Sequence, residues 1–269
     1  MELGLTGRRA VVTGGSKGLG KAIAAELLAE GAAVAICSRQ AGQLEETAAE
    51  LRATAAELRA AAGPGASRRQ LLALPADVTD PAQVTDFVAA ATAGLGGLDI
   101  LVNNAGGARP GRFAALTDDD WHDDIEVKLF SQIRCIRAAL PHLRSSAAPR
   151  VININALYAR YPDPAFLASS VNRASCLSLS KALSIELGAE GILVNSVNIG
   201  FVETPQWENI HRKRAPEMPA DEFFGQLAKA EVPLGRFGRP DEVAGLVAFL
   251  ASDIDGASID VGGGMGKSL

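Results

Sequence analysis

The chain has 269 residues, of which 48% are hydrophobic and 21% charged, and its formal net charge is −5. This length and composition are ample for one well-buried core, and the acidic balance argues against a broad surface for nucleic acid or anionic membranes. The N-terminus has no apolar core of signal-peptide length, and no stretch approaches the roughly 20 apolar residues of a membrane span. We therefore expect a cytoplasmic enzyme or binding protein that has neither nucleic acid nor a membrane as its partner.

The beginning of the chain alternates short apolar strands with helices. Ala10–Val12 is predicted to be a strand, followed by a glycine-rich turn and a helix over Lys21–Ala29. Gly31 is suited to follow the C-terminus of this helix. An unbroken apolar run at Ala33–Cys37 predicts a strand buried on both faces, and an alanine-rich helix is expected over Gln43–Ala62.

The alanine-rich helix contains an internal repeat, because the segment TAAELRA occurs twice in tandem. Its apolar stripe at heptad spacing consists of Leu44, Ala48, Leu51, Ala55 and Leu58. We interpret the stripe as the face of a lengthened helix that covers the sheet. The alternative is a short coiled-coil seam that binds a partner.

The alternation continues along the rest of the chain. A loop is expected at Gly63–Arg69, and Asp80 followed by Pro81 is typical of a helix N-terminus. Thr117–Asp120 has the spacing of a capping box, at the head of a helix that runs through Ile133 and beyond. Further strands are predicted at Leu71–Leu74, Ile100–Val102, Val151–Ile154, Leu193–Val197 and Ala257–Val261, and further helices at Val171–Leu187 and Ala244–Ala251.

This order of elements predicts a single α/β domain over residues 1–269, with a Rossmann-type doubly wound parallel sheet of about seven strands and helices on both faces. The segment Phe201–Glu231, which contains three prolines and several aromatic residues, is the most irregular and is expected to form a mobile cover of loops or helices over a substrate site. Trp207, Phe223 and Phe224 within it either line an apolar substrate pocket or pack within the cover itself.

The cysteines and histidines do not suggest a metal or disulfide framework. Cys37, Cys135 and Cys176 are odd in number, widely spaced and in apolar surroundings, so we predict reduced thiols in the core. The three histidines are scattered along the chain, and no metal site is expected.

A glycine-rich segment, Thr13–Gly20, joins the first strand to the first helix. Glycines at this point let the backbone turn tightly and approach a pyrophosphate, while the helix N-terminus supplies free N–H groups. Asn103–Gly106 follows the fourth strand and Asp77 with Val78 follows the third, so both are expected at the carboxyl edge of the sheet. The pattern predicts a dinucleotide site there.

With Pro233–Arg236 and Ile259–Gly264 added, the chain resembles the short-chain dehydrogenase/reductase family over nearly its whole length, close to the ketoacyl-reductase-like members. The resemblance implies a nicotinamide cofactor, a small-molecule substrate and a homodimer or homotetramer. The apolar stripe expected at the subunit contact is Leu177, Leu179, Leu183 and Leu187. Carried over position by position, the cofactor-binding residues are Gly14, Ser16, Lys17, Gly18, Leu19, Gly20, Ser38, Arg39, Asp77, Val78, Asn104, Ala105, Gly106, Arg173, Gly200 and Thr204.

Charge indicates which cofactor is preferred. The second strand ends at Arg39, where an NAD-specific site usually offers a carboxylate to the ribose. Arg39 and Lys17 instead place two cations where a 2′-phosphate would lie. This favours NADP(H) over NAD(H), and the alternative is that both are solvated surface charges.

The family's catalytic residues are a Ser, a Tyr, a Lys and an Asn, and each matching position departs from that set. Ala156 stands at the serine position, Ser169 at the tyrosine position and Arg173 at the lysine position. Lys128 stands where the asparagine is expected. The resemblance therefore implies an active site with an atypical set of residues.

The remaining groups differ in what they could do. Ser169 is a much weaker acid than a phenol, whose pKa is about 10, and Arg173 cannot titrate usefully but could hold ribose hydroxyls. An ammonium at Lys128, partly buried beside another cation, should have a lowered pKa and could donate a proton. The alternative for Lys128 is a solvated or ion-paired lysine, and Tyr158 is either a replacement acid or a pocket wall.

Three functions stay open at this point. The first is an NADP(H)-dependent oxidoreductase that acts on a carbonyl or alcohol with an atypical proton donor. The second is a nucleotide-binding or regulatory protein that has lost the chemistry, since three catalytic residues are replaced together. The third is a non-redox isomerase or lyase that uses the same pocket.

Overall fold

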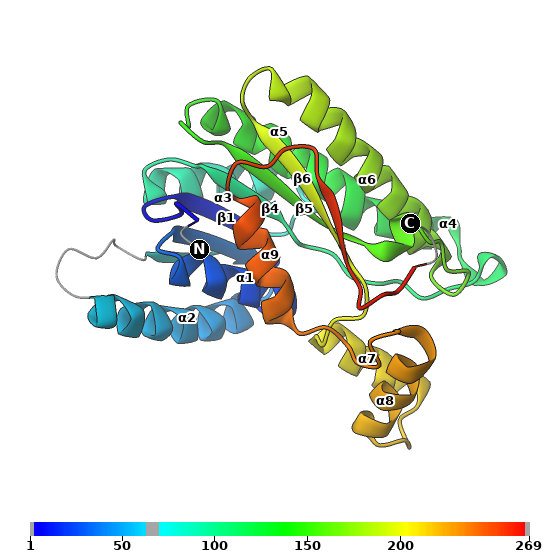
Figure 1. The fold of residues 1–269 in the computed structure, drawn as a ribbon. Helices are drawn as coiled ribbons and strands as arrows, with labels where there is room; N and C mark the ends of the chain where they lie inside the picture. Colours follow the sequence, from blue (N-terminus) through cyan, green and yellow to red (C-terminus); the bar gives the residue numbers. More distant parts are fainter. Residues whose placement is uncertain (1–2, 63–69, 267–269) are drawn as a thin grey trace.

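The computed structural model describes residues 3–62 and 70–266. Parallel strands form one sheet in the order β3-β2-β1-β4-β5-β6-β7, as Figure 1 shows. The predicted doubly wound parallel sheet is thus confirmed. The strands are β1 (Arg9–Thr13), β2 (Ala33–Ser38), β3 (Leu71–Pro75), β4 (Ile100–Asn103), β5 (Arg150–Ala156), β6 (Leu193–Ile199) and β7 (Ser258–Val261).

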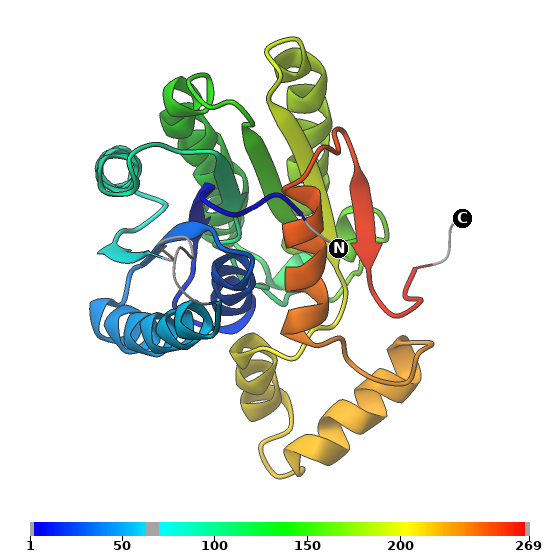
Figure 2. The same cartoon turned by 60° about the vertical axis from the view of Figure 1, so that its left-hand side comes forward.

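Helices cover both faces of this sheet. The main helices are α1 (Gly18–Ala29), α2 (Ala41–Ala62), α3 (Pro81–Leu95), α4 (Asp118–Ile125), α5 (Ser131–Leu143), α6 (Leu167–Gly188), α7 (Pro205–Arg214), α8 (Ala220–Glu231) and α9 (Pro240–Leu250). Helices α1, α2 and α9 pack together on one face, and α3, α5 and α6 lie on the other (Figure 2).

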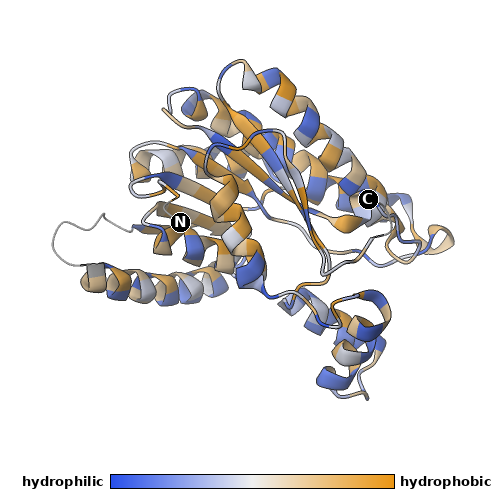
Figure 3. Cartoon of the chain, in the orientation of Figure 1, coloured by the Kyte–Doolittle hydropathy of each residue, from blue (hydrophilic) through white to orange (hydrophobic). Residues whose placement is uncertain are grey.

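The strands are buried on both sides because successive side chains point to opposite faces. Val12 and Ile36 pack toward α1 and α9, whereas Val11 and Ala35 pack toward α3 and α5. Figure 3 shows the hydrophobic colouring concentrated on the strands. The three cysteines are buried and free, as predicted.

Most strands run slightly further than the apolar runs suggested. Strand β5 continues through Asn155 to Ala156, which pair with Asn198 and Ile199 of β6. The backbone ladder does not depend on side-chain polarity, so a polar residue at the end of an apolar run stays in the sheet. This extension carries Asn155 and Ala156 to the carboxyl edge of the sheet.

The alanine-rich stripe of α2 faces the sheet. Leu44, Ala48, Leu51 and Ala55 are buried in the core shared with α1 and β2, and Leu58 is half-buried. The interpretation as a covering helix is therefore confirmed. The loop expected at Gly63–Arg69 lies outside the described residues.

The long helix expected after Thr117 is interrupted by a π-helical turn. The capping box forms as predicted, with the Asp120 N–H donating to Thr117 Oγ1 and Asp120 accepting from the Thr117 N–H. Helix α4 then passes into the π-helical turn η2 (Glu126–Phe130) before α5 begins. The expectation of one continuous α-helix was wrong. Such turns occur frequently at functional sites, and this one contains the buried Lys128.

The segment Phe201–Glu231, for which loops or helices were expected, forms helices α7 and α8, which project from the carboxyl end of the sheet (Figure 1). Pro205 occupies the first turn of α7, where its fixed φ favours a helix. Trp207 packs against Phe201 and Phe237 and lines a cavity, whereas Phe223 and Phe224 pack within the helical cover.

Within the described ranges, no helix combines the length and apolar character that a membrane crossing requires. The same residues bring together no group of three side chains that could hold a metal ion.

Replacing Leu51 with alanine tests the packing of α2. Leu51 is buried, so Leu51→Ala is expected to lower the free energy of unfolding by about 2–5 kcal/mol without changing the oligomeric state. The exposed Glu57 on the same helix is the control, and Glu57→Ala should change stability by less than about 0.5 kcal/mol. Urea unfolding and light scattering measure both quantities. An unchanged unfolding energy with a changed mass would instead identify α2 as a contact between subunits.

Candidate active site

One cavity of about 880 Å³ opens at the carboxyl edge of the sheet. It extends from the glycine-rich segment after β1, past the ends of β4 and β5, to the first turns of α6 and α7. Every residue that the sequence placed in the cofactor or catalytic set lines this cavity, from Gly14 at one end to Thr204 at the other. The structure therefore brings both sets together in one place.

A polar tie fixes the geometry of the cavity between β1 and β4. The amide Nδ2 of Asn104 donates to the carbonyl oxygens of Thr13 at 2.9 Å and Gly14 at 3.2 Å. In return, Thr13 Oγ1 accepts from the backbone N–H groups of Asn104 and Ala105, both at 3.0 Å. The two segments therefore hold each other in position where the strand order reverses, which is where such sheets bind ligands.

The glycine-rich segment is packed so closely that side chains would not fit. An added Cβ at Gly20 would lie 2.3 Å from the Gly14 oxygen and 2.5 Å from Asn104 Nδ2. Gly14 and Gly18 have φ values of +67° and +53°, a region that favours glycine. Helix α1 begins at Gly18, earlier than the expected Lys21, so its free N–H groups face the cavity floor. These features fit the pyrophosphate of a dinucleotide.

Three charged residues, Lys17, Arg39 and Asp77, border the cavity near the end of β2. The Arg39 guanidinium is 71% exposed and lies 3.9 Å from the Asp77 carboxylate, a loose contact. Ser38 Oγ accepts from Ser16 Oγ at 2.9 Å, which joins the end of β2 to the glycine-rich segment. Lys17 is exposed at the N-terminus of α1. Both cations thus border the cavity without a tight ion pair between either of them and a described carboxylate.

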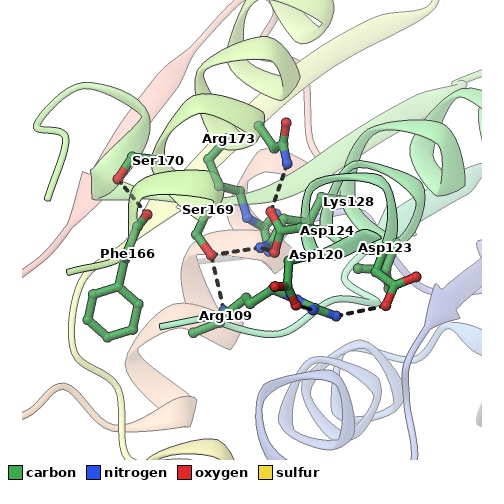
Figure 4. A network of polar contacts seen from close by, with 12 residues as sticks. Arg109, Asp120, Asp123, Asp124, Lys128, Phe166, Ser169, Ser170 and Arg173 are labelled. Atoms are coloured by element: carbon green, nitrogen blue, oxygen red, sulfur yellow. Dashed lines mark hydrogen bonds and ion pairs between the residues drawn. The ribbon is translucent and has the colours of Figure 1, made fainter. Parts of the chain in front are cut away.

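The chemical end of the cavity is built around a buried lysine. The Lys128 side chain is 1% exposed, and its ammonium forms an ion pair with Asp124, which is 2% exposed. Lys128 Nζ also donates to Ser169 Oγ at 2.8 Å (Figure 4). Of the alternative considered from the sequence, a solvated or ion-paired lysine, the structure shows the ion-paired form and not the solvated one, because the group is buried against Asp124.

Ser169, at the start of α6, accepts a second hydrogen bond. The backbone N–H of Arg109 donates to Ser169 Oγ at 3.1 Å. The Arg109 side chain in turn pairs with Asp120 and Asp123 of α4, as Figure 4 shows. The segment after β4 is thereby fixed against α4 and against the hydroxyl of Ser169.

Arg173, one turn further along α6, supplies a second buried cation. Its Nη1 donates to the Ile154 carbonyl at 2.7 Å, and its own carbonyl accepts from Asn155 Nδ2 at 3.1 Å. Among the described residues it has no carboxylate within ion-pair distance. Because a guanidinium has five N–H donors, several are left to serve a bound ligand.

The charges at this end change the acidity of Lys128. Burial, followed by the Arg173 guanidinium, lowers the pKa of the Lys128 ammonium, while Asp124 acts in the opposite direction, and the net value is about 8. The lowered value expected from the sequence follows from these contacts. An acid in this range is close to neutral pH, where general acids are most effective.

Tyr158 lies in the short helix η3 (Leu157–Ala159) and stacks on Phe166, with ring centroids 5.2 Å apart. Burial raises the pKa of its phenol above the ordinary value, and Asp163 acts in the same direction. A phenol with a raised pKa is a poorer proton donor, so these surroundings favour a pocket wall. Ala156, at the end of β5, presents only a methyl group to the cavity.

Sequence reasoning missed two polar residues at this end. Asp124 lies four positions before Lys128, a spacing that signals a helical ion pair but not that the pair is buried. Asn172 donates from Nδ2 to Asp124 Oδ2 at 2.8 Å, and no local pattern indicates this contact between α6 and α4. The roles of Asp124 and Asn172 at this site depend on how α4 packs against α6, so they can be recognised only from the three-dimensional structure.

Comparisons with known proteins agree over the full length of the chain. A family model described as enoyl-(acyl carrier protein) reductase matches residues 14–266. A 3-oxoacyl-(acyl-carrier-protein) reductase from Salmonella typhimurium is 34% identical over 263 residues, which cover 96% of this chain and 97% of that protein.

Solved structures are similar over the same length. A short chain oxidoreductase from Pseudomonas aeruginosa PAO1, described as containing an atypical catalytic center, is 38% identical with a TM-score of 0.86 and covers 97% of this chain and 98% of its own. That protein has also been solved with NADPH bound. L-sorbose reductase from Gluconobacter frateurii, in complex with NADPH and L-sorbose, is 29% identical with a TM-score of 0.91 over 100% of both chains.

A methyl group at Gly20 tests the close packing beneath the cavity. Because the added Cβ would collide with the Gly14 oxygen, Gly20→Ala should weaken binding of NADPH by ~10-fold or more, about 1.4 kcal/mol. Calorimetric titration with NADPH measures the loss. Gly42→Ala is the matched control, because a Cβ at Gly42 meets nothing within 4 Å and should leave the affinity unchanged. Equal affinities for both variants would contradict the placement of the cofactor over this segment.

Proposed function

The chain belongs to the short-chain dehydrogenase/reductase family of oxidoreductases, and we propose that it interconverts a carbonyl and an alcohol with NADP(H), using Lys128 as its proton donor. The observation that carries the proposal is the contact of 2.8 Å between the buried Lys128 ammonium and Ser169 Oγ inside the cavity. It supplies a titratable proton at the end of the cavity where Ser169 replaces the family's tyrosine.

The residues of the cavity fit a nicotinamide dinucleotide. The glycine-rich segment and the N-terminus of α1 would hold the pyrophosphate, and the free donors of Arg173 would hold hydroxyls of the nicotinamide ribose. When bound, the cofactor supplies or accepts the hydride. The tie between Asn104 and Thr13 keeps this part of the site preorganised.

The preference for NADP(H) rests on charge. Arg39 and Lys17 border the adenosine end of the cavity, and Asp77 approaches Arg39 only at 3.9 Å, so the guanidinium is available to a 2′-phosphate. The complexes of the Pseudomonas and Gluconobacter proteins with NADPH support the same choice.

The hydrogen bonds around Ser169 define a route for the proton. Its oxygen accepts from Lys128 Nζ and from the Arg109 N–H, so both acceptor positions of the hydroxyl are occupied. The hydroxyl proton is then free to point into the cavity and to bind a substrate oxygen. As that oxygen gains negative charge, Ser169 passes its proton on and takes one from Lys128.

This arrangement also limits the reaction's pH range. Reduction requires the protonated ammonium of Lys128, whose pKa is about 8, so the donor is present at neutral pH and is lost as the pH rises further. General acid catalysis of this kind supplies ~10²–10⁴ in rate. The site therefore does not need a tyrosine to provide a proton near neutral pH.

The substrate side of the cavity is apolar. Leu157, Tyr158, Phe166, Trp207 and Met265 line it beyond Ser169. An apolar wall with a polar hydroxyl at its end suits a small molecule that carries its carbonyl on an aliphatic or aromatic body.

We further propose a homodimer or homotetramer that uses the outer face of α6. Val171 is 49% exposed and Ile185 is 71% exposed on this helix. The stripe expected from the sequence is only partly available, because Leu187 is buried in the chain's own core and Leu183 packs against that core.

Reversing the charge of Arg39 tests the cofactor assignment. Arg39→Glu should weaken NADPH binding by ~10-fold or more, about 1.4 kcal/mol, and should leave NADH binding nearly unchanged, because only NADPH carries the 2′-phosphate. Calorimetric titration with each cofactor gives the two affinities. Arg52→Glu, on α2 outside the cavity, controls for the change in net charge. Equal losses for both cofactors would show that Arg39 does not contact a phosphate.

Replacing Lys128 tests the proton donor. Lys128→Met should reduce the rate of carbonyl reduction by ~10² or more and should keep the affinity for NADPH. The measurement is oxidation of NADPH over a panel of ketones and aldehydes between pH 6 and about 10, in which the wild-type rate should fall as pH passes the Lys128 pKa of about 8. The exposed Lys181 on α6 provides the control variant, Lys181→Met.

Other outcomes of this assay favour the other functions. Tight NADPH binding with no turnover of any substrate would favour a binding or regulatory protein. Product formation without oxidation of NADPH would favour a non-redox reaction. An unchanged rate for Lys128→Met in an active enzyme would leave the lysine with a structural role only.

A further inference from the structure

We propose that Asp124, held by Asn172, is a positioning residue that keeps the Lys128 ammonium at Ser169 and sets the pH range in which it carries its proton. The inference rests on the proposed function of Lys128, and it adds two residues that lie outside the family's catalytic positions. Asp124 acts through Lys128 and is not itself a proton donor.

The geometry around the carboxylate is fully determined. Asp124 Oδ1 accepts from Lys128 Nζ, and Oδ2 accepts from Asn172 Nδ2 at 2.8 Å. Asp124 and Asn172 are 2% and 3% exposed. Because each oxygen has its own donor from a different helix, the carboxylate cannot rotate without losing a buried hydrogen bond.

This fixed carboxylate restrains a flexible side chain. A lysine carries its charge on a four-carbon stem with substantial rotamer freedom. The Lys128 ammonium is held at two points, Asp124 on one side and Ser169 on the other. Without the contact to Asp124, the ammonium could move away from Ser169, so proton delivery to Ser169 depends on the carboxylate.

The same carboxylate balances charge. The charged and titratable groups that act on Lys128 are Asp124 from α4 and Arg173 and Cys176 from α6. Burial raises the pKa of the Cys176 thiol, so this group stays neutral near pH 7. Asp124 is then the anion that offsets two buried cations, and without it the repulsion from Arg173 would lower the pKa of the Lys128 ammonium.

Titration of Lys128 itself provides a test that needs no substrate. In protein labelled with carbon-13 at the lysine ε-carbons and saturated with NADP⁺, the Lys128 resonance is identified by its loss in Lys128→Met. The wild-type midpoint is expected at about 8. Asp124→Asn, which is isosteric, should lower this midpoint by about one unit or more, because the opposite charge is removed. The matched control is Asp119→Asn, an exposed carboxylate on the same helix that lies outside the cavity, which should leave the midpoint unchanged.

A second variant keeps both charges in place. Asn172→Ala removes the donor to Asp124 Oδ2, so the carboxylate becomes a stronger partner for the ammonium and the Lys128 midpoint should rise. A purely structural role would not produce shifts of opposite sign in the two variants. If Asp124→Asn did not fold, Asn172→Ala alone would be the test. A rise of the Lys128 midpoint in this variant would support the inference, and an unchanged or lower midpoint would overturn it.

The outcomes separate this inference from the proposed function. Midpoints that stay at the wild-type value in both variants would overturn the positioning role, even if Lys128→Met abolished reduction. Opposite shifts would support it, and the high-pH limb of the reductase rate should move with each midpoint. The midpoint could shift in opposite directions while Lys128→Met stays fully active. That result would support the effect of Asp124 on the pKa of Lys128, but it would overturn the proposal that Lys128 is the proton donor.

Discussion

The site depends first on the polar tie between the ends of β1 and β4. Asn104 takes up the carbonyl oxygens of Thr13 and Gly14 just where the backbone leaves the sheet and turns into the glycine-rich segment. The amide thereby gives a hydrogen-bond donor to both carbonyls in a position too crowded for a side chain at Gly20. The turn beneath this end of the cavity is thus held by backbone groups, the Asn104 amide and the Thr13 hydroxyl. This tie makes no contact with Lys128, Ser169 or Arg173, so the geometry of this end does not depend on the residues at the other end of the cavity.

The chemical half depends on a buried charge that stability alone does not explain. Lys128 is among the largest fully buried side chains of the described residues, and its partner Asp124 is equally enclosed. Taking both ions out of water is costly, and apolar residues of similar volume often give a more stable protein. Here the ammonium faces a hydroxyl that lines the cavity, and its pKa is lowered toward neutral pH. Perturbed groups that converge on a cavity are typical of catalytic sites, and this is the basis on which we propose a chemical role for Lys128.

The sequence predicted the features that depend only on neighbouring residues, such as helix caps and buried strands. The Asp80 side chain caps α3 by accepting hydrogen bonds from backbone N–H groups only two and three residues away. The unbroken apolar run Ala33–Cys37 is typical of a strand that is buried on both faces of a sheet. The three prolines after Phe201 left loops and helices both open for this segment, and Pro205 lies in the first turn of α7, where its fixed φ favours a helix. The burial of Asp124 and its bond to Asn172 could not be predicted, since both depend on how α4 packs against α6 and on the π-helical turn between α4 and α5. The sequence located the cavity residues by position but contained no signal for this contact between helices.

Charge explains why the aspartate accompanies the lysine. In the family's usual pair a neutral tyrosine stands beside a cationic lysine, so the site has a charge of +1 before proton transfer and zero after it. Lys128 and Arg173 alone would make these values +2 and +1, which burial would oppose strongly. With Asp124 included, the buried groups return to +1 before transfer and zero after it. The carboxylate beside the ammonium therefore keeps the charge of the buried groups at the value that a tyrosine and a lysine would give, and the structure has that carboxylate in contact with the ammonium.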